Sequence, residues 1–183
     1  MKKNRGFSLV NILSGISLSL LILTFGYTCY RDFIERLEIK KAKVEIYETF
    51  TTYGAKAFND KKRLKIKLDY ITKKITVYEF GVVPIDIINL PKNLKYTTIF
   101  DDETKEIFNC EITKNGNITP SFSVYIFDYD DIAQYRISLY GFDVLRYLRV
   151  NIYRNKGDKT PHYDRILSFH RRWNTSNPKW EGE

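Results

Sequence analysis

Residues 7–30 read FSLVNILSGISLSLLILTFGYTCY and contain neither a charged side chain nor a proline. As an α-helix with a rise of ~1.5 Å per residue, this run would be about 36 Å long. A hydrocarbon core of ~30 Å requires about 20 apolar residues, so the run is long enough to span a membrane. Three basic residues, Lys2, Lys3 and Arg5, precede it. The positive-inside rule therefore predicts that the N-terminus stays in the cytoplasm and that the following residues are exported.

A secretory signal peptide is one alternative for this segment. Its apolar region would be only about 7–15 residues long and would end at a small-x-small cleavage site. Here the apolar run is longer, no such site follows it, and the sequence after Tyr30 is charged and compatible with a helix. An uncleaved signal anchor is the alternative that the apolar run itself leaves open.

The helix is predicted to continue beyond the membrane. No proline occurs before Pro84, and helix-compatible sequence extends to about residue 58. Apolar residues recur there mostly three, four and seven positions apart, which predicts one apolar stripe on a polar helix. The residues of this predicted stripe are Phe33, Leu37, Val44, Tyr47, Gly54 and Phe58. We therefore predict one helix over residues 7–58, roughly 75 Å long, and expect Leu37→Asp to damage the body by burying an unpaired charge.

Residues 62–153 alternate between apolar and polar side chains in several short runs, which predicts half-buried strands. The predicted strands lie near residues 63–70, 75–77, 108–112, 122–126, 135–139 and 148–152. Asn115-Gly116 favours a tight turn and predicts a hairpin between the runs at 108–112 and 122–126. Pro84 and Pro91 predict a loop around residues 85–90. The fold class expected is α+β, with a long N-terminal helix, transmembrane in its first half and amphipathic in its second, packed on an antiparallel sheet of about six strands.

The junction Lys2-Lys3-Asn4-Arg5-Gly6-Phe7-Ser8-Leu9-Val10 resembles the class III signal of the type IV pilin-like family. The resemblance implies a leader of residues 1–6, cut by a prepilin peptidase between Gly6 and Phe7, and N-methylation of Phe7. The chain departs from the family pattern at Asn11, where pilins usually have Glu. In pilins that Glu is thought to neutralise the N-terminal amine of a neighbouring subunit, so Asn11 implies a position at the filament tip or a low copy number.

The body is similar in layout to H-type pseudopilins of type II secretion and to competence pseudopilins, through NGNITPSFSVYIF and YRISLYGFDVLRYLRV. The resemblance implies a pilin-like fold and a minor pilin or pseudopilin of a filament used in secretion, pilus assembly or DNA uptake. It also implies a place in the inner membrane and four partners: other pilins, the prepilin peptidase, an assembly platform and the lipid bilayer. Two alternatives stay open: a minor pilin that binds DNA or a secreted cargo, and a membrane-anchored extracytoplasmic domain unrelated to filaments.

Residues 154–183 lie outside that resemblance. Tyr163, Ile166, Leu167 and His170 are spaced for a short amphipathic helix. The segment also interleaves basic residues with Trp173 and Trp180, a composition that suits binding of nucleic acid. A solvated, partly docked tail is the commoner explanation of such a segment. The formal charge of +8 would fall to +5 without Lys2, Lys3 and Arg5, an excess too modest to indicate a polyanionic partner.

No catalytic or cofactor-binding pattern occurs in the sequence, so we expect neither an enzyme nor a cofactor. His162 and His170 are the only histidines, and neither lies at metal-ligand spacing from a cysteine. The acidic run Asp128 to Asp131 lacks the glycine and distal Glu of a calcium-binding loop, and a solvated turn is expected there. Cys29 falls in the apolar segment and Cys110 in a predicted strand, so a disulfide between them is not expected.

Overall fold

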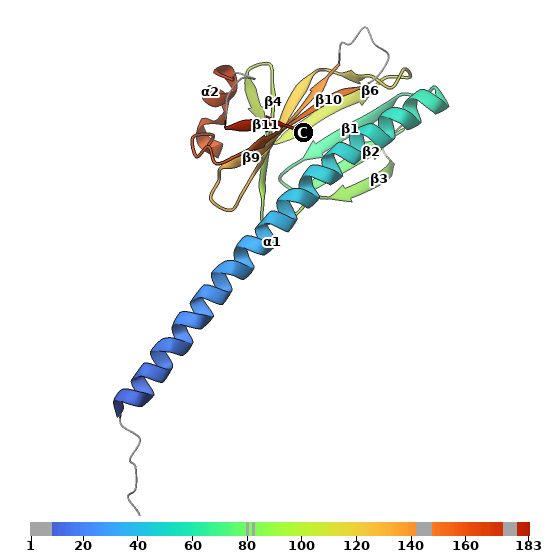
Figure 1. Ribbon diagram of the computed structural model, residues 1–183. Helices are drawn as coiled ribbons and strands as arrows, with labels where there is room; N and C mark the ends of the chain where they lie inside the picture. Colours follow the sequence, from blue (N-terminus) through green and yellow to red (C-terminus); the bar gives the residue numbers. More distant parts are fainter. Residues whose placement is uncertain (1–8, 80, 82, 142–147, 174–178) are drawn as a thin grey trace, which may run out of the picture. The chain divides into compact units, whose positions relative to one another are not determined.

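The computed structural model describes residues 9–79, 81, 83–141, 148–173 and 179–183 of the protein (Figure 1). The chain forms two compact units, Met1–Leu37 and Glu38–Glu183. Helix α1, Leu9–Asp60, supplies the described structure of the first unit and continues as the first element of the second. The candidate cleavage residues Gly6 and Phe7 lie outside the described residues.

In the second unit, α1 packs with a face that the sequence pattern did not identify. Its buried residues recur mostly every three or four positions: Ile39, Ala42, Ile46, Thr49, Phe50, Gly54 and Ala57. Of the predicted stripe only Gly54 is buried, whereas Leu37 is 48% exposed and Tyr47 41% exposed. The buried face is built partly from small residues, which let the helix approach the strands but contribute little hydrophobicity to a sequence pattern. The predicted stripe was therefore wrong, and so was the expectation that Leu37→Asp buries a charge.

Eleven strands of the described residues form two antiparallel sheets. The five-stranded sheet has the order β3 (Pro84–Asn89), β2 (Lys74–Tyr78), β1 (Leu64–Asp69), β6 (Ile107–Ile112), β7 (Ile118–Thr119). The six-stranded sheet has the order β11 (Trp180–Gly182), β10 (Arg149–Asn155), β9 (Ala133–Tyr140), β8 (Phe122–Phe127), β4 (Lys95–Phe100), β5 (Glu103–Lys105). The α+β class with a long helix packed on antiparallel strands is thus confirmed, with two sheets in place of one.

The turn at Asn115-Gly116 joins different strands from those predicted. β6 pairs with the short β7, with Ile112 opposite Ile118, and the Gly116 N–H donates to the Thr113 carbonyl at 2.8 Å. Pro120 follows β7 and has no N–H to donate to a ladder. β8 then pairs with β4 and β9 in the other sheet, so the predicted hairpin between residues 108–112 and 122–126 was wrong.

The predicted loop around residues 85–90 was also wrong, because β3 occupies Pro84–Asn89 and pairs with β2. Pro84 is the first residue of a strand at the edge of its sheet, a position where proline is tolerated. The proline that suggested a loop therefore marks the beginning of an edge strand.

One core joins the buried face of α1 to the inner faces of both sheets, with Phe50, Ile66, Ile126 and Ile137 among its members. A second cluster lies on the six-stranded sheet and includes Tyr125, Phe127, Ile166 and Trp180. It is formed with the 3-10 helix η1 (Tyr163–Arg165), helix α2 (Ile166–Arg171) and strand β11. The short helix predicted from Tyr163 onwards is confirmed. In Figure 1 these elements are the orange and red ribbons beside β4 and β9.

Candidate functional site

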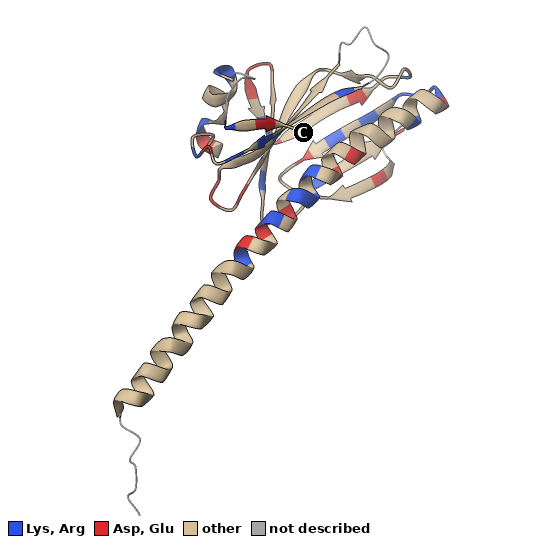
Figure 2. Cartoon of the chain, in the orientation of Figure 1, with Lys and Arg blue, Asp and Glu red and all other residues tan. Residues whose placement is uncertain are grey.

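The first half of α1 presents an apolar surface that nothing in its own unit covers. Among the described residues, α1 is the helix long and apolar enough to cross a membrane, and its most apolar window is wholly unburied. Leu9, Leu21 and Phe25 are 71%, 67% and 69% exposed. Figure 2 shows no charged residue on this part of the helix. Such a surface requires an apolar surrounding, and the chain has the form of a single-pass, membrane-anchored protein.

Polar side chains inside this segment are satisfied by the helix itself. Ser19 Oγ donates to the Gly15 carbonyl at 2.9 Å, and Thr24 Oγ1 donates to the Leu20 carbonyl at 2.8 Å. Thr28 Oγ1 donates in the same way to the Thr24 carbonyl at 3.0 Å. A hydroxyl bonded to the carbonyl four residues before it does not need water. These residues therefore do not prevent the segment from lying in hydrocarbon.

The apolar surface ends at aromatic and then charged residues. Tyr27 and Tyr30 are 69% and 63% exposed, and Arg31 and Asp32 follow directly. Tyrosine is enriched where a membrane-spanning helix meets water, because its ring is apolar and its hydroxyl polar. Residues 9–30 extend for about 33 Å at ~1.5 Å per residue, which places this boundary one membrane thickness from Leu9.

Asn11 lies in the first described turn of this surface and is exposed. Its amide group is a neutral polar group among the apolar side chains Val10 and Ile12. Cys29, near the other end, is exposed, whereas Cys110 is buried and its Sγ lies 3.7 Å from the Ile66 carbonyl. Both cysteines are free. Of the site residues predicted, only Asn11 is among the described residues.

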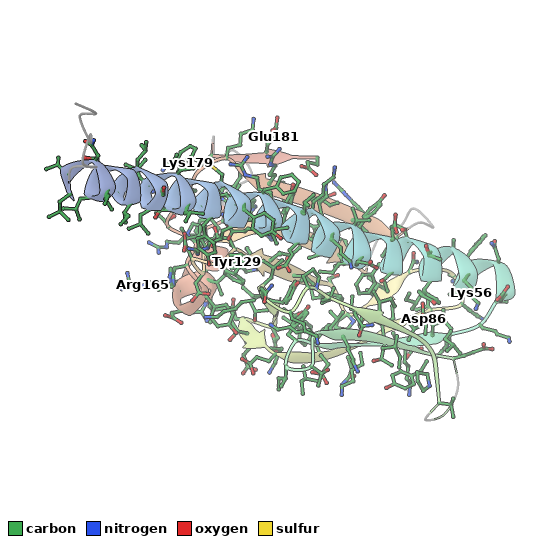
Figure 3. All side chains as sticks on the ribbon, turned by 90° about the horizontal axis from the view of Figure 1, so that it is seen from below. Lys56, Asp86, Tyr129, Arg165, Lys179 and Glu181 are labelled. Atoms are coloured by element: carbon green, nitrogen blue, oxygen red, sulfur yellow. The ribbon has the colours of Figure 1, made fainter. Side chains whose placement is uncertain are left out.

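The second unit holds its part of α1 by polar contacts at the beginning of the packed segment. Glu38 accepts hydrogen bonds from Asn93 Nδ2 at 2.9 Å and from the Tyr129 hydroxyl at 3.0 Å. Asn93 lies between β3 and β4, and Tyr129, labelled in Figure 3, lies between β8 and β9. The helix is therefore attached to two loops as well as to the core, a role for Glu38 that no local pattern indicated.

The aromatic and basic residues of 154–183 contact the body. Trp180 is only 6% exposed, and the Arg136 guanidinium lies 4.4 Å from the centre of the Trp173 ring. Arg171 pairs with Asp102 of the body at 3.4 Å, and Lys156 pairs with Glu181 of the same segment at 2.8 Å. Buried Trp180 cannot stack on a base.

The histidines and the acidic turn also have structural partners. Tyr125 Oη lies 3.0 Å from His170 Nδ1, and burial, aided by the charge of Arg136, lowers the pKa of His170 to about 4. Asp128 Oδ1 accepts hydrogen bonds from the N–H groups of Asp130 and Ile132, so its carboxylate shapes the turn. Among the described residues, no three His, Cys, Asp or Glu side chains form a group able to hold a metal ion.

No family model matches the chain, and no curated protein matches it. The solved structures similar to it include two of the minor pseudopilin EpsH from the type II secretion system of Vibrio cholerae. One is 13% identical, covers 63% of this chain and 94% of its own, and has a TM-score of 0.43. The other is 15% identical, covers 64% and 94%, and has a TM-score of 0.44. The element order of this chain, one long N-terminal helix followed by antiparallel strands packed on its second half, is a pilin-like arrangement.

Proposed function

We propose that the protein is a minor subunit of a type IV pilus-like filament, held in the cytoplasmic membrane by α1 before assembly. The observation that carries the proposal is the continuity of α1, which is apolar and unburied over residues 9–30 and packed on antiparallel strands from Ile39 onwards. One helix of this kind can leave a bilayer and pack against helices of other subunits while the body stays in water. No catalytic group is required for such a role.

The basic residues before the helix and the Gly6-Phe7 junction support two further parts of the proposal. A prepilin peptidase removes residues 1–6, and the new N-terminal Phe7 is methylated. The N-terminus faces the cytoplasm and the body lies outside the membrane, where it meets other pilins and the assembly platform. The filament serves secretion, pilus assembly or DNA uptake.

Leader processing tests the proposal directly. We expect co-expression with a prepilin peptidase to shorten the chain so that it begins at Phe7, as measured by intact mass. Gly6→Leu should block cleavage and Gly6→Ala should permit it. Gly15→Leu is the matched control, since a side chain at Gly15 meets nothing within 4 Å and should leave cleavage unchanged. A mature chain that keeps Met1 to Arg5 in its native host would identify a signal anchor and overturn the proposal.

A further inference from the structure

Strand β3 has one side without a partner strand in the described part of the chain. It ends the five-stranded sheet and pairs only with β2. The Leu90 N–H donates to the Lys73 carbonyl at 2.9 Å, and hydrogen-bonded pairs alternate along an antiparallel ladder. Ile88 and Asp86 therefore bond to β2, whereas the backbone groups of Ile87 and Asn89 face away from it.

The outward amide of Ile87 is shielded by a side chain and not by another strand. The Ile87 N–H donates to Asp86 Oδ1 at 2.8 Å, and Asp86 Oδ2 accepts a hydrogen bond from the Tyr53 hydroxyl at 2.6 Å. Pro84 and the inward-facing charge of Asp86 both protect an edge strand, and the Asp86 carboxylate must rotate away from the Ile87 N–H before a strand can pair there. The edge is thus protected in a way that an incoming strand can reverse.

The same edge is unusually apolar for an exposed strand. Val83 is 76% exposed, Ile85 41% and Ile87 47%. Soluble proteins usually place lysine or another charge on such an edge to prevent pairing with other chains. β3 carries one charge, Asp86, but Ile85 and Ile87 of the strand and Val83 just before it are exposed β-branched residues beside outward backbone groups, which suits an added strand.

The charge beside the edge indicates which partner fits. Ile87 lies opposite Thr76, and Asn89 opposite Lys74, so Lys74 is next to the edge on the outer face of the sheet. Lys65 and Lys67 lie farther along that face, over an open cavity of about 680 Å³. Asp69 lies opposite Lys74 and Glu111 opposite Lys65 on this face, but they pair with Lys67 and Arg63, and no ion pair of Lys65 or Lys74 occurs among the described residues. A second copy paired through its own β3 would bring its own Lys74 to the same face.

We propose that β3 binds an extended segment of another protein, which adds a sixth strand alongside Ile85 to Asn89. This segment carries aliphatic side chains beside Ile87 and a carboxylate toward Lys74 on the outer face. On the inner face, next to Asp86 and Tyr53, it carries small neutral side chains. The inference does not depend on the function proposed for α1, because both the edge and its charges belong to the second unit.

A defined peptide tests this with the full chain in detergent micelles. The probe is a capped, fluorescent peptide of sequence Val-Thr-Val-Thr-Glu-Thr, and its counterpart has Lys in place of Glu. We expect saturable binding of the first peptide by fluorescence anisotropy and weaker binding of the second. Lys74→Glu should reverse that preference. Hydrogen exchange should show new protection at Asn89 when the first peptide is bound.

Two variants at Ile87 separate backbone pairing from side-chain contact. Ile87→Pro removes an N–H that does not bond to β2, so the fold is kept, and we expect about tenfold weaker binding. Ile87→Ala keeps the N–H and should weaken peptide binding less than Ile87→Pro does.

The proposal is overturned if the first peptide shows no saturable binding, or if neither Ile87→Pro nor Lys74→Glu changes that binding. Self-association of the chain that Ile87→Pro abolishes would assign the edge to a second copy and would equally overturn it. If the Ile87→Pro variant does not fold, the effect of Lys74→Glu on the preference between the two peptides tests the proposal by itself.

Discussion

Lys43 Nζ lies 2.6 Å from Glu183 Oε2, which joins α1 to the residue that follows β11. The other oxygen of Glu183 accepts a hydrogen bond from the Tyr135 hydroxyl at 3.3 Å, and Lys43 Nζ lies 5.2 Å from the centre of the Tyr135 ring. The Glu183 N–H donates to the Ile152 carbonyl at 2.9 Å. One helix residue is therefore connected to strands β9, β10 and β11 of the six-stranded sheet.

Replacement of Glu183 should reduce stability in a pH-dependent way. The hydrogen bond from Lys43 lowers the pKa of Glu183. The contribution of ionised Glu183 to the free energy of unfolding is therefore present above the usual glutamate pKa and is lost as the pH falls through the lowered pKa. We expect Glu183→Gln to lower the melting temperature at pH 7, by an amount worth at most about 1 kcal/mol for a partly exposed pair. The difference from the unaltered protein should shrink as the pH falls through the lowered pKa of Glu183. Glu181→Gln, in the more exposed pair with Lys156, should have a smaller effect; an equal effect would contradict a specific role of Glu183.

Removal of residues 1–31 should leave a soluble, folded domain. Every buried residue of α1 lies at Ile39 or beyond, and the second unit begins at Glu38. In this fragment Leu37→Asp should be tolerated, because Leu37 is 48% exposed, whereas Ile46→Asp should unfold it, because Ile46 is fully buried. Circular dichroism and thermal unfolding measure both. An insoluble fragment, or equal damage by the two substitutions, would show that the packed face of α1 is assigned wrongly.

The sequence predicted the elements whose signal is local and missed those that depend on distant partners. The alternation of residues 63–70 and 135–139 marked two strands, and the absence of charge from 7 to 30 marked the apolar helix. Strand β4 carries Thr97 and Thr98, which are buried although polar, because the Tyr70 hydroxyl lies 2.7 Å from Thr98 Oγ1. No pattern within residues 95–100 contains that information.

The candidate site likewise combines a feature that the local sequence predicts with contacts that depend on distant residues. Exposure of an apolar helix follows from its composition, so the membrane-facing surface could be predicted. Glu38 is one charged residue among many in the helix, and only the folded positions of Asn93 and Tyr129 distinguish it. The edge at β3 was missed because Pro84 indicated a loop, although proline is equally compatible with the first residue of an edge strand.

A methyl group at Gly116 should be more harmful than one at Gly81. Both glycines have positive φ, +79° and +86°, so an alanine at either is strained by about 1 kcal/mol. A Cβ at Gly116 would also lie 2.9 Å from the Gly54 carbonyl oxygen, whereas one at Gly81 meets nothing within 4 Å. We expect Gly116→Ala to cost at least about 1 kcal/mol more than Gly81→Ala in chemical unfolding. Equal costs would mean that α1 and the β6–β7 turn do not approach closely.

His170 should make the stability of the body fall in mild acid. Its pKa in the folded protein, about 4, is below its ordinary value of 6.5. As the pH falls, the unfolded chain therefore binds a proton at this histidine before the folded chain does. The contribution of neutral His170 to the free energy of unfolding is complete above pH 6.5 and is lost as the pH falls toward 4. His170→Gln should flatten the dependence of melting temperature on pH across this interval, and His162→Gln serves as the control. An unchanged slope in His170→Gln would contradict the burial of the imidazole against Tyr125.

Asn11 should limit how often this subunit is incorporated along a filament. In the pilins that the N-terminal junction resembles, Glu at this position is thought to neutralise the amine of a neighbouring subunit inside an apolar core. An uncompensated charge at such depth costs on the order of 2.5–3.5 kcal/mol on insertion scales. Asn11 can accept a hydrogen bond but cannot cancel the charge, so, on the proposed function, we expect the protein at the tip or in a low-copy initiating complex, where no earlier amine needs pairing.

The position of the subunit can be measured together with the effect of Asn11→Glu. In purified filaments we expect few copies relative to the major subunit, with gold-labelled bodies concentrated at one end. Asn11→Glu should raise the copy number and move label onto the shaft, because the carboxylate can now pair with a neighbouring amine. Asn11→Gln matches the glutamate in size without the charge and should leave both unchanged. A high copy number spread evenly along the shaft in the unaltered protein would contradict the role of Asn11, as would an Asn11→Glu variant with the same position and abundance.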